Sequence, residues 1–198
     1  MKYFLFVLFF VFVSCTNKKN ENSTPIQKVI VIQPLGDFSL NEAERVLSEI
    51  KAINPNVVLR KNIEFPKGSY YQPRNRYRAD SIIKSLKNNI EKDSVIVGLS
   101  NFDISTTKNG IKDWGVMGLG YNPGKSCVVS TFRLSRKNKN EQFYKLVLHE
   151  LGHTEGLPYC KVKTCLMRDA KGGNPFNEEK SFCNNCKSFL ENKGWSLI

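Results

Sequence analysis

Short, continuously apolar runs alternate along the chain with longer segments in which apolar residues recur every three or four positions. The run Lys28–Gln33 is rich in β-branched residues and is followed by Pro34 and Gly36, which predicts a buried strand. A helix is predicted next, with Ser39 or Asn41 as its N-cap. The apolar residues at helical spacing in this segment are Ala43, Val46, Leu47, Ile50 and Ile53.

The same alternation continues further along the chain. Val57–Leu59 and Ser94–Leu99 predict two more strands, and Ala79–Ile90 predicts an amphipathic helix between them. The segment Tyr70–Arg78, which precedes that helix, is aromatic and basic. Strands that alternate with helices favour an α/β fold, and we expect these first three strands to be parallel.

Two later segments indicate a hairpin. Gly115–Tyr121 and Ser126–Arg133 flank the turn residues Asn-Pro-Gly at positions 122–124. We therefore expect an antiparallel strand at or near the edge of a sheet that is otherwise parallel. Further on, the apolar spacing within Glu141–His153 predicts another helix.

Composition narrows the class of protein. Of the 198 residues, 40% are apolar and 24% are charged, which excludes a disordered, collagen-like or multi-span membrane chain and predicts one domain over residues 26–198. The 30 Lys and Arg residues outnumber the 18 Asp and Glu residues, for a formal charge of +12. These basic residues are scattered and no recognised nucleic-acid-binding module is present, so we expect no nucleic-acid partner. We also expect the protein to be a monomer.

The amino-terminal sequence predicts the location of the protein. A short cationic start is followed by the apolar run Tyr3–Val13 and by Ser14-Cys15, which is typical of a secretory signal over residues 1–14. Its ending resembles a bacterial lipobox, which implies that Cys15 is lipidated; the alternative is an ordinary signal peptide with a chance cysteine. Residues 15–25 are polar and predict a flexible tether. We expect a protein anchored by lipid to a membrane of the bacterial cell envelope, on its extracytoplasmic side, periplasmic or at the surface.

The strongest motif is His149-Glu150-Leu151-Gly152-His153, which contains both histidines of the chain. On a helix, residues four positions apart lie on one face with Cβ atoms about 5–6 Å apart, so the two imidazoles can share a zinc ion. Glu150, between them in sequence, can then act as the general base of a metallopeptidase. The alternative is a pair of surface or core histidines without a metal.

The residues after this motif predict further metal chemistry. Gly156 can turn the chain sharply, as in the metzincin pattern HExxHxxGxxH, where that turn returns a third ligand to the zinc. Tyr159 stands at the position of the third histidine. Four cysteines in C-x4-C and C-x2-C spacing then supply a complete tetrahedral set for a structural zinc, with two disulfides as the alternative. These cysteines are Cys160, Cys165, Cys183 and Cys186, whereas Cys127 is expected to be a small buried residue.

Taken together, residues 149–186 resemble the archaemetzincin family, through HELGHTEGLPYC, KTCLM and CNNC. Weaker similarity extends upstream through residues 75–83, 97–104 and 128–134. The resemblance implies a metzincin-like α/β (α+β) fold, with a twisted mixed sheet, a zinc helix and a small C-terminal subdomain that holds a four-cysteine zinc site. It also implies that Met167 lies beneath the catalytic zinc and that a strand within residues 115–121 pairs with an extended peptide.

Tyr159 departs from the family pattern and leaves three possibilities for the catalytic site. The tyrosine can ligate zinc through its phenolate, because bound zinc favours the deprotonated form of an oxygen ligand. A carboxylate such as Glu155 or Asp169 can replace the missing histidine. The third possibility is a site that binds zinc weakly and is a poor catalyst.

The sequence therefore predicts a zinc metallopeptidase with two zinc ions per chain, one catalytic and one structural. In this hypothesis His149 and His153 hold the catalytic zinc and Glu150 activates water for attack on a peptide or protein substrate. The alternative is a catalytically weak or inactive, zinc-stabilised envelope lipoprotein that binds a peptide or a protein partner.

Overall fold

The computed structural model of the chain describes residues 28–197. The predicted signal peptide (1–14), the lipidated Cys15 and the tether (15–25) lie outside these residues and stay predictions. Within residues 28–197, no helix is both long and apolar enough to cross a bilayer.

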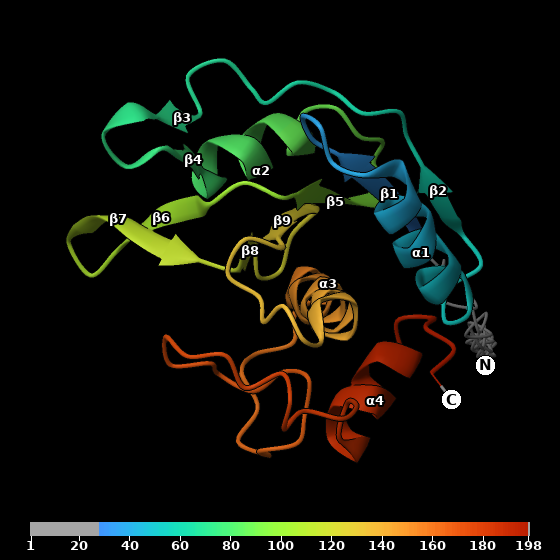
Figure 1. Cartoon of the computed structure of the whole chain (residues 1–198). Helices are drawn as coiled ribbons and strands as arrows, with labels where there is room; N and C mark the ends of the chain where they lie inside the picture. Colours follow the sequence, from blue (N-terminus) through green and yellow to red (C-terminus); the bar gives the residue numbers. More distant parts are fainter. Residues whose placement is uncertain (1–27, 198) are drawn as a thin grey trace, which may run out of the picture.

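The larger of two sheets has five strands in the order β2-β1-β5-β9-β8 (Figure 1). Strands β2, β1, β5 and β9 are parallel to their neighbours, whereas β8 runs antiparallel to β9 at the edge of the sheet. The predicted parallel strands and the antiparallel edge strand are thus confirmed. The strands are β1 (Val29–Pro34), β2 (Val57–Leu59), β5 (Ser94–Ser100), β8 (Gly118–Gly120) and β9 (Ser126–Ser130).

Helices cover both faces of this sheet, because alternate side chains of each strand point to opposite faces. Ile30 and Ile32 of β1 belong to a buried cluster with α1 and α3, whereas Val31 belongs to a second cluster with α2. Helix α1 begins after Ser39, whose hydroxyl accepts a hydrogen bond from the Glu42 amide, as expected of an N-cap. The helices are α1 (Leu40–Lys51), α2 (Ala79–Lys87) and α3 (Lys139–Glu155).

A smaller sheet in the order β3-β4-β6-β7 extends beyond the main one (Figure 1). Its hairpin turns at Asn109 and Gly110, which both have positive φ, as an Asn-Gly hairpin turn requires. The sequence analysis overlooked this hairpin and expected one strand over residues 115–121; the chain instead leaves the small sheet after Val116 and joins the main sheet at Gly118. The elements of this region are β3 (Tyr70–Tyr71), a short 3-10 helix η1 (Gln72–Arg74), β4 (Arg76–Arg78), β6 (Ile104–Lys108) and β7 (Ile111–Val116).

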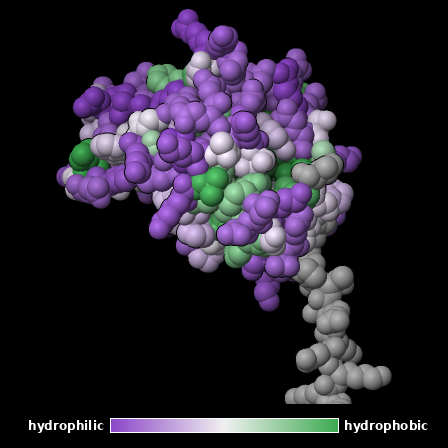
Figure 2. Space-filling view, turned by 90° about the horizontal axis from the view of Figure 1, so that it is seen from below, coloured by the Kyte–Doolittle hydropathy of each residue, from purple (hydrophilic) through white to green (hydrophobic). Residues whose placement is uncertain are grey.

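The C-terminal region packs beneath α3 (Figure 1). Residues 157–183 form turns and isolated bridges, and they lead into helix α4 (Asn184–Glu191). Leu190 and Trp195 are buried in the same cluster as α3, so the apolar positions of this region point inward. Hydrophilic residues cover most of the face seen from below, with a smaller group of hydrophobic residues near its lower centre (Figure 2). The predicted mixed α/β fold with a small C-terminal subdomain is confirmed.

Candidate active site

Helix α3 places the two histidines side by side on one face. The ring centroids of His149 and His153 are 4.7 Å apart and the rings are perpendicular. Both residues are buried, with exposed fractions of 8% and 7%. The predicted i, i+4 placement thus brings the two imidazoles within reach of a common point.

Backbone carbonyls determine which ring nitrogens face that point. His149 Nδ1 lies 2.5 Å from the Leu166 carbonyl oxygen and His153 Nδ1 lies 2.8 Å from that of Leu157. Since a carbonyl can only accept, each Nδ1 carries the hydrogen and each Nε2 keeps a lone pair for a metal. The buried Nε2 of His153 has no hydrogen-bond partner among residues 28–197, as expected of a nitrogen that ligates a metal. The residues present therefore fit a zinc ion.

The surroundings also keep both imidazoles neutral. Burial lowers the pKa of His149 to about 4, and the neighbouring His153 adds to this effect. Burial likewise lowers the pKa of His153.

Asn122, in the loop before β9, places its side-chain amide 3.2 Å from His153 Nδ1 and donates a hydrogen bond to the Leu157 carbonyl. The sequence analysis treated Asn122 only as a turn residue and overlooked this contact.

The side chain of Glu150, a residue of α3, points toward the edge strand β8. A Cβ atom at Gly118 would stand 2.5 Å from Glu150 Oε1, and one at Gly120 would stand 3.2 Å from Oε2, so the carboxylate occupies space that these glycines leave open. Burial raises the pKa of Glu150 to about 8. The carboxylate is thus held beside the histidines and near the strand that was expected to bind a peptide.

The end of α3 turns the chain back toward the histidines. Gly156 has a φ of 106°, and the amide of Leu157 donates to the Gly152 carbonyl, which closes the helix in the left-handed manner typical of glycine. Met167 then passes beneath α3 and is fully buried. Its Sδ would lie 2.6 Å from a Cβ at Gly152, so a side chain at that position would displace Met167.

Tyr159 lies against both histidines after this turn. Its ring centroid is 4.9 Å from that of His153 and 5.9 Å from that of His149, and 56% of the residue is exposed. Of the two alternative carboxylates, Glu155 is engaged by Lys28, whose Nζ lies 2.9 Å from Oε2. Asp169, by contrast, lines the same cavity as His149 and Tyr159.

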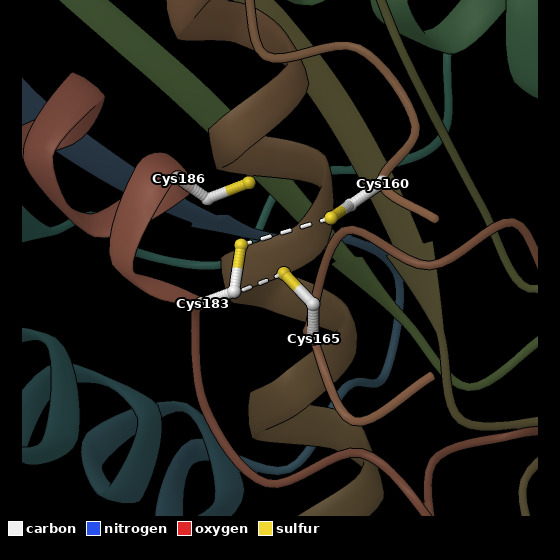
Figure 3. A group of neighbouring side chains, drawn as sticks. All are labelled: Cys160, Cys165, Cys183 and Cys186. Carbon is white, nitrogen blue, oxygen red and sulfur yellow. Dashed lines mark hydrogen bonds between the residues drawn. The ribbon is translucent and has the colours of Figure 1, made fainter. Parts of the chain in front are cut away.

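The four cysteines converge at a second point in the C-terminal region (Figure 3). Their Sγ atoms all lie within 4.8 Å of one another, and those of Cys160 and Cys183 are 3.7 Å apart. Tetrahedral zinc with Zn–S bonds of about 2.3 Å requires sulfur–sulfur distances of about 3.8 Å. These cysteines are free thiols in the structure, as is the buried Cys127. The cluster therefore has the arrangement of a four-thiolate metal site and not of two separate disulfides.

A cavity of about 420 Å³ opens beside the histidines. His149, Glu150 and Tyr159 line it from one side, and residues 168–176 line it from the other. Glu179, which the sequence analysis did not single out, also contributes to its wall. No local pattern marks Glu179 in the sequence, because the loop that carries it has neither helical nor strand periodicity.

Comparison with known proteins agrees with the geometry. Residues 32–192 match the model of peptidase family M54. The chain is 28% identical over 170 residues to an archaemetzincin of Halobacterium salinarum, covering 79% of this chain and 95% of that protein. An archaemetzincin of Methanopyrus kandleri is 27% identical over 168 residues, covering 83% of this chain and 90% of that protein.

Solved structures show the same fold. The crystal structure of the Methanopyrus kandleri archaemetzincin matches with a TM-score of 0.69 at 22% identity, over 83% of this chain and 95% of that one. The archaemetzincin of Archaeoglobus fulgidus, solved as a complex with malonate, matches with a TM-score of 0.69 at 25% identity, over 81% of this chain and 98% of that one. The chain thus belongs to peptidase family M54, the archaemetzincin family of zinc metallopeptidases.

Proposed function

We propose that the protein hydrolyses peptide bonds with a zinc ion held by His149, His153 and Tyr159, and with Glu150 as general base. The observation that carries this proposal is the orientation of the two buried imidazoles. Both Nδ1 atoms are engaged by carbonyls, and the buried Nε2 of His153 has no other partner among residues 28–197. Tyr159 stands at the third-ligand position of the metzincin pattern, and its ring lies beside both histidines.

The chemistry divides between the metal and Glu150. When bound, zinc supplies Lewis-acid activation of water and of the scissile carbonyl. Glu150 takes the proton of the attacking water and returns it to the departing amine nitrogen. Its position supports this role, because the buried carboxylate lies next to the histidines and against the glycines of the edge strand.

The edge strand β8 provides the surface on which a substrate backbone can bind. It pairs with β9 on one side only, and its glycines lie next to Glu150. An extended peptide added along this edge gains main-chain hydrogen bonds and passes directly beside the histidines. Substrates are therefore expected to bind in extended form, as unfolded chains or short peptides.

The cysteine cluster supports a second, structural zinc ion. Cys160, Cys165, Cys183 and Cys186 supply four ligands and leave no open position, which is typical of zinc sites that stabilise a fold. We expect two zinc ions per chain in the purified protein. We also propose that a lipid attached to Cys15 anchors the enzyme outside the cytoplasm, on the basis of the signal sequence predicted over residues 1–14. We expect the enzyme to act as a monomer.

Cleavage of an unfolded protein by the zinc-loaded enzyme tests the proposal. We expect wild type to cleave denatured casein, a metal chelator to stop the reaction, and Tyr159→His to cleave at least as fast. An inactive lipoprotein that only binds peptides predicts the opposite: no cleavage by wild type and activity only after Tyr159→His. Failure of both proteins to cleave any peptide in a diverse mixture would overturn the peptidase proposal.

A further inference from the structure

The cavity beside the histidines has an exposed rim and a buried floor. Tyr159 and Trp114 stand at the rim, with exposed fractions of 56% and 37%. Leu146, Phe176 and Glu179 form the floor, with exposed fractions of 2%, 3% and 1%. Leu146 precedes His149 by one turn of α3, so the floor begins about 5–6 Å from a proposed metal ligand. A side chain next to the scissile bond can reach this depth.

Glu179 is the charged group of the floor. Neither oxygen of its carboxylate has a hydrogen-bond partner within residues 28–197, although the residue is almost fully buried. Burial raises the pKa of this carboxyl to about 7, although the charges of the nearby Arg168 and Lys145 act in the opposite direction. Natural proteins seldom leave a buried carboxylate unpaired without a functional reason.

The nearby cations are committed to other partners. Lys145 Nζ donates to the backbone carbonyls of Phe176 and Glu179, at 2.8 and 2.7 Å, and pairs with Glu141 at 2.6 Å. Arg168 lies 2.7 Å from the carboxylate of Glu178. Within residues 28–197, the Glu179 carboxylate thus has no hydrogen-bonded cation, and its two buried oxygens keep their capacity to accept from one.

We propose that Glu179 selects substrates with a lysine or arginine next to the scissile bond, by receiving the cationic end of that side chain at the cavity floor. This role rests on the proposed peptidase activity. Leu146 and Phe176 are apolar and suit the aliphatic stem of a long basic side chain, while the carboxylate suits its charged tip.

Basic groups at the rim oppose this preference only weakly. Lys108 and Lys171 are exposed, and water and salt screen their charges. Arg133 also lines the cavity, and its guanidinium pairs with Asp103, with Nε 2.7 Å from Oδ1, although Arg76 shares that aspartate. The buried carboxylate is screened less than these groups, so it determines which charge is favoured at the floor.

Peptides that differ at a single residue test the proposal. A cleaved bond is first identified by mass spectrometry, and lysine, arginine, norleucine or glutamate is then placed at each residue that flanks it. We expect wild type to prefer lysine over norleucine by about tenfold in kcat/KM at one flanking position. Glu179→Gln should remove this preference, whereas Glu191→Gln, which removes the same charge on α4 and outside the cavity wall, should keep it.

A binding measurement separates this proposal from the peptidase proposal. In the Glu150→Gln background, Kd for the same peptides is measured by fluorescence anisotropy, and the lysine peptide should bind about tenfold more tightly unless Glu179 is also changed. If the lysine peptide binds more tightly but wild type cleaves no peptide, the role of Glu179 in binding a basic side chain would be supported and the peptidase proposal would be overturned. If Glu179→Gln does not fold, Glu179→Asp should keep the preference at a smaller ratio. Equal values for lysine and norleucine in wild type, or a preference that survives Glu179→Gln, would overturn the role of Glu179.

Discussion

The two candidate metal sites of this protein are built in opposite ways. The cysteine cluster has four like ligands, and they come from loops and from the start of α4, where regular structure is sparse. The histidine site has two ligands on one long helix, and its third neighbour, Tyr159, is more than half exposed. One site is complete in a region with little regular structure, and the other is open on a long helix that packs in the main core.

This difference indicates what each metal does. A closed set of four thiolates stabilises the fold around it, whereas an open set on a rigid support leaves room for a substrate. The two sites are also linked through the chain, because Cys165 and Cys183 enclose the segment that carries Glu179 and the far wall of the cavity. The closed site thus supports the shape of the open one.

The largest effect is expected from breaking the closed site. Cys183→Ser should lose one zinc ion and lower Tm by roughly 10 °C or more, since structural zinc contributes directly to folding. Metal analysis and calorimetry measure the two quantities. Cys127→Ala serves as the matched control, because Cys127 is buried away from the cluster; it should cost about 1–2 kcal/mol and retain both zinc ions. A Cys183→Ser protein with full zinc content and unchanged Tm would contradict the structural role.

Substitution of Glu150 at the histidine site should lower the rate of peptide cleavage and leave the stability of the fold nearly unchanged. Glu150→Gln should lower kcat/KM by about 10²- to 10⁴-fold, with zinc content retained, because it removes only the proton acceptor. Glu155→Gln, five residues along the same helix, should lower Tm slightly by breaking its pair with Lys28 and should leave kcat/KM nearly unchanged. Comparable losses of activity in both variants would argue against a specific role for Glu150.

In our proposal, Tyr159 determines whether the zinc at the histidine site has two or three protein ligands. Tyr159→Phe should weaken zinc binding at that site by roughly 10- to 100-fold in chelator competition, while the cysteine site keeps its zinc. Copper loaded into the histidine site should give a phenolate-to-metal charge-transfer band that Tyr159→Phe lacks. Identical spectra for the two proteins would exclude Tyr159 as a ligand and favour Asp169, which lines the same cavity.

The smallest effect concerns the cavity wall that joins the two sites. The Glu179 carboxyl titrates near 4.5 when exposed and near 7 in the folded protein, so the folded state binds the proton more tightly. Its burial therefore lowers stability increasingly as pH rises from about 4.5 to 7. By linkage, this shift sets an upper bound of roughly 2–3 kcal/mol on the gain in unfolding free energy of Glu179→Gln relative to wild type between pH 5 and pH 8. Water that reaches the cavity screens the charge, so we expect about 1 kcal/mol. A difference between the two proteins that does not change with pH would contradict this assignment.

Local pattern was sufficient for much of the fold. The β-branched run at β1 and the helical spacing within α3 depend on near neighbours, so the sequence predicted both elements close to their observed bounds. The hairpin β6–β7 was overlooked although Asn109-Gly110 is a strong turn signal, because its strands are short and partly polar.

The candidate site was predictable only where spacing along the chain dictates proximity. The i, i+4 histidines and the turn at Gly156 bring His149, His153 and Tyr159 together in a way that sequence spacing describes. Glu179 and Asn122 lie in loops that the tertiary fold brings to the site. Their positions in the sequence follow no periodic pattern from which this proximity could be predicted. Residues that shape the cavity were therefore harder to predict than the proposed ligands.

The close approach of Gly152 and Met167 has a consequence for sequence variation. A Cβ atom at position 152 would lie 2.6 Å from the Met167 sulfur, so the buried Met167 side chain would have to shift to admit it. We expect them to covary in an alignment of related chains. In a saturation mutagenesis library, position 152 should be as intolerant as the histidines, and a shorter residue at 167 should partly restore an alanine at 152.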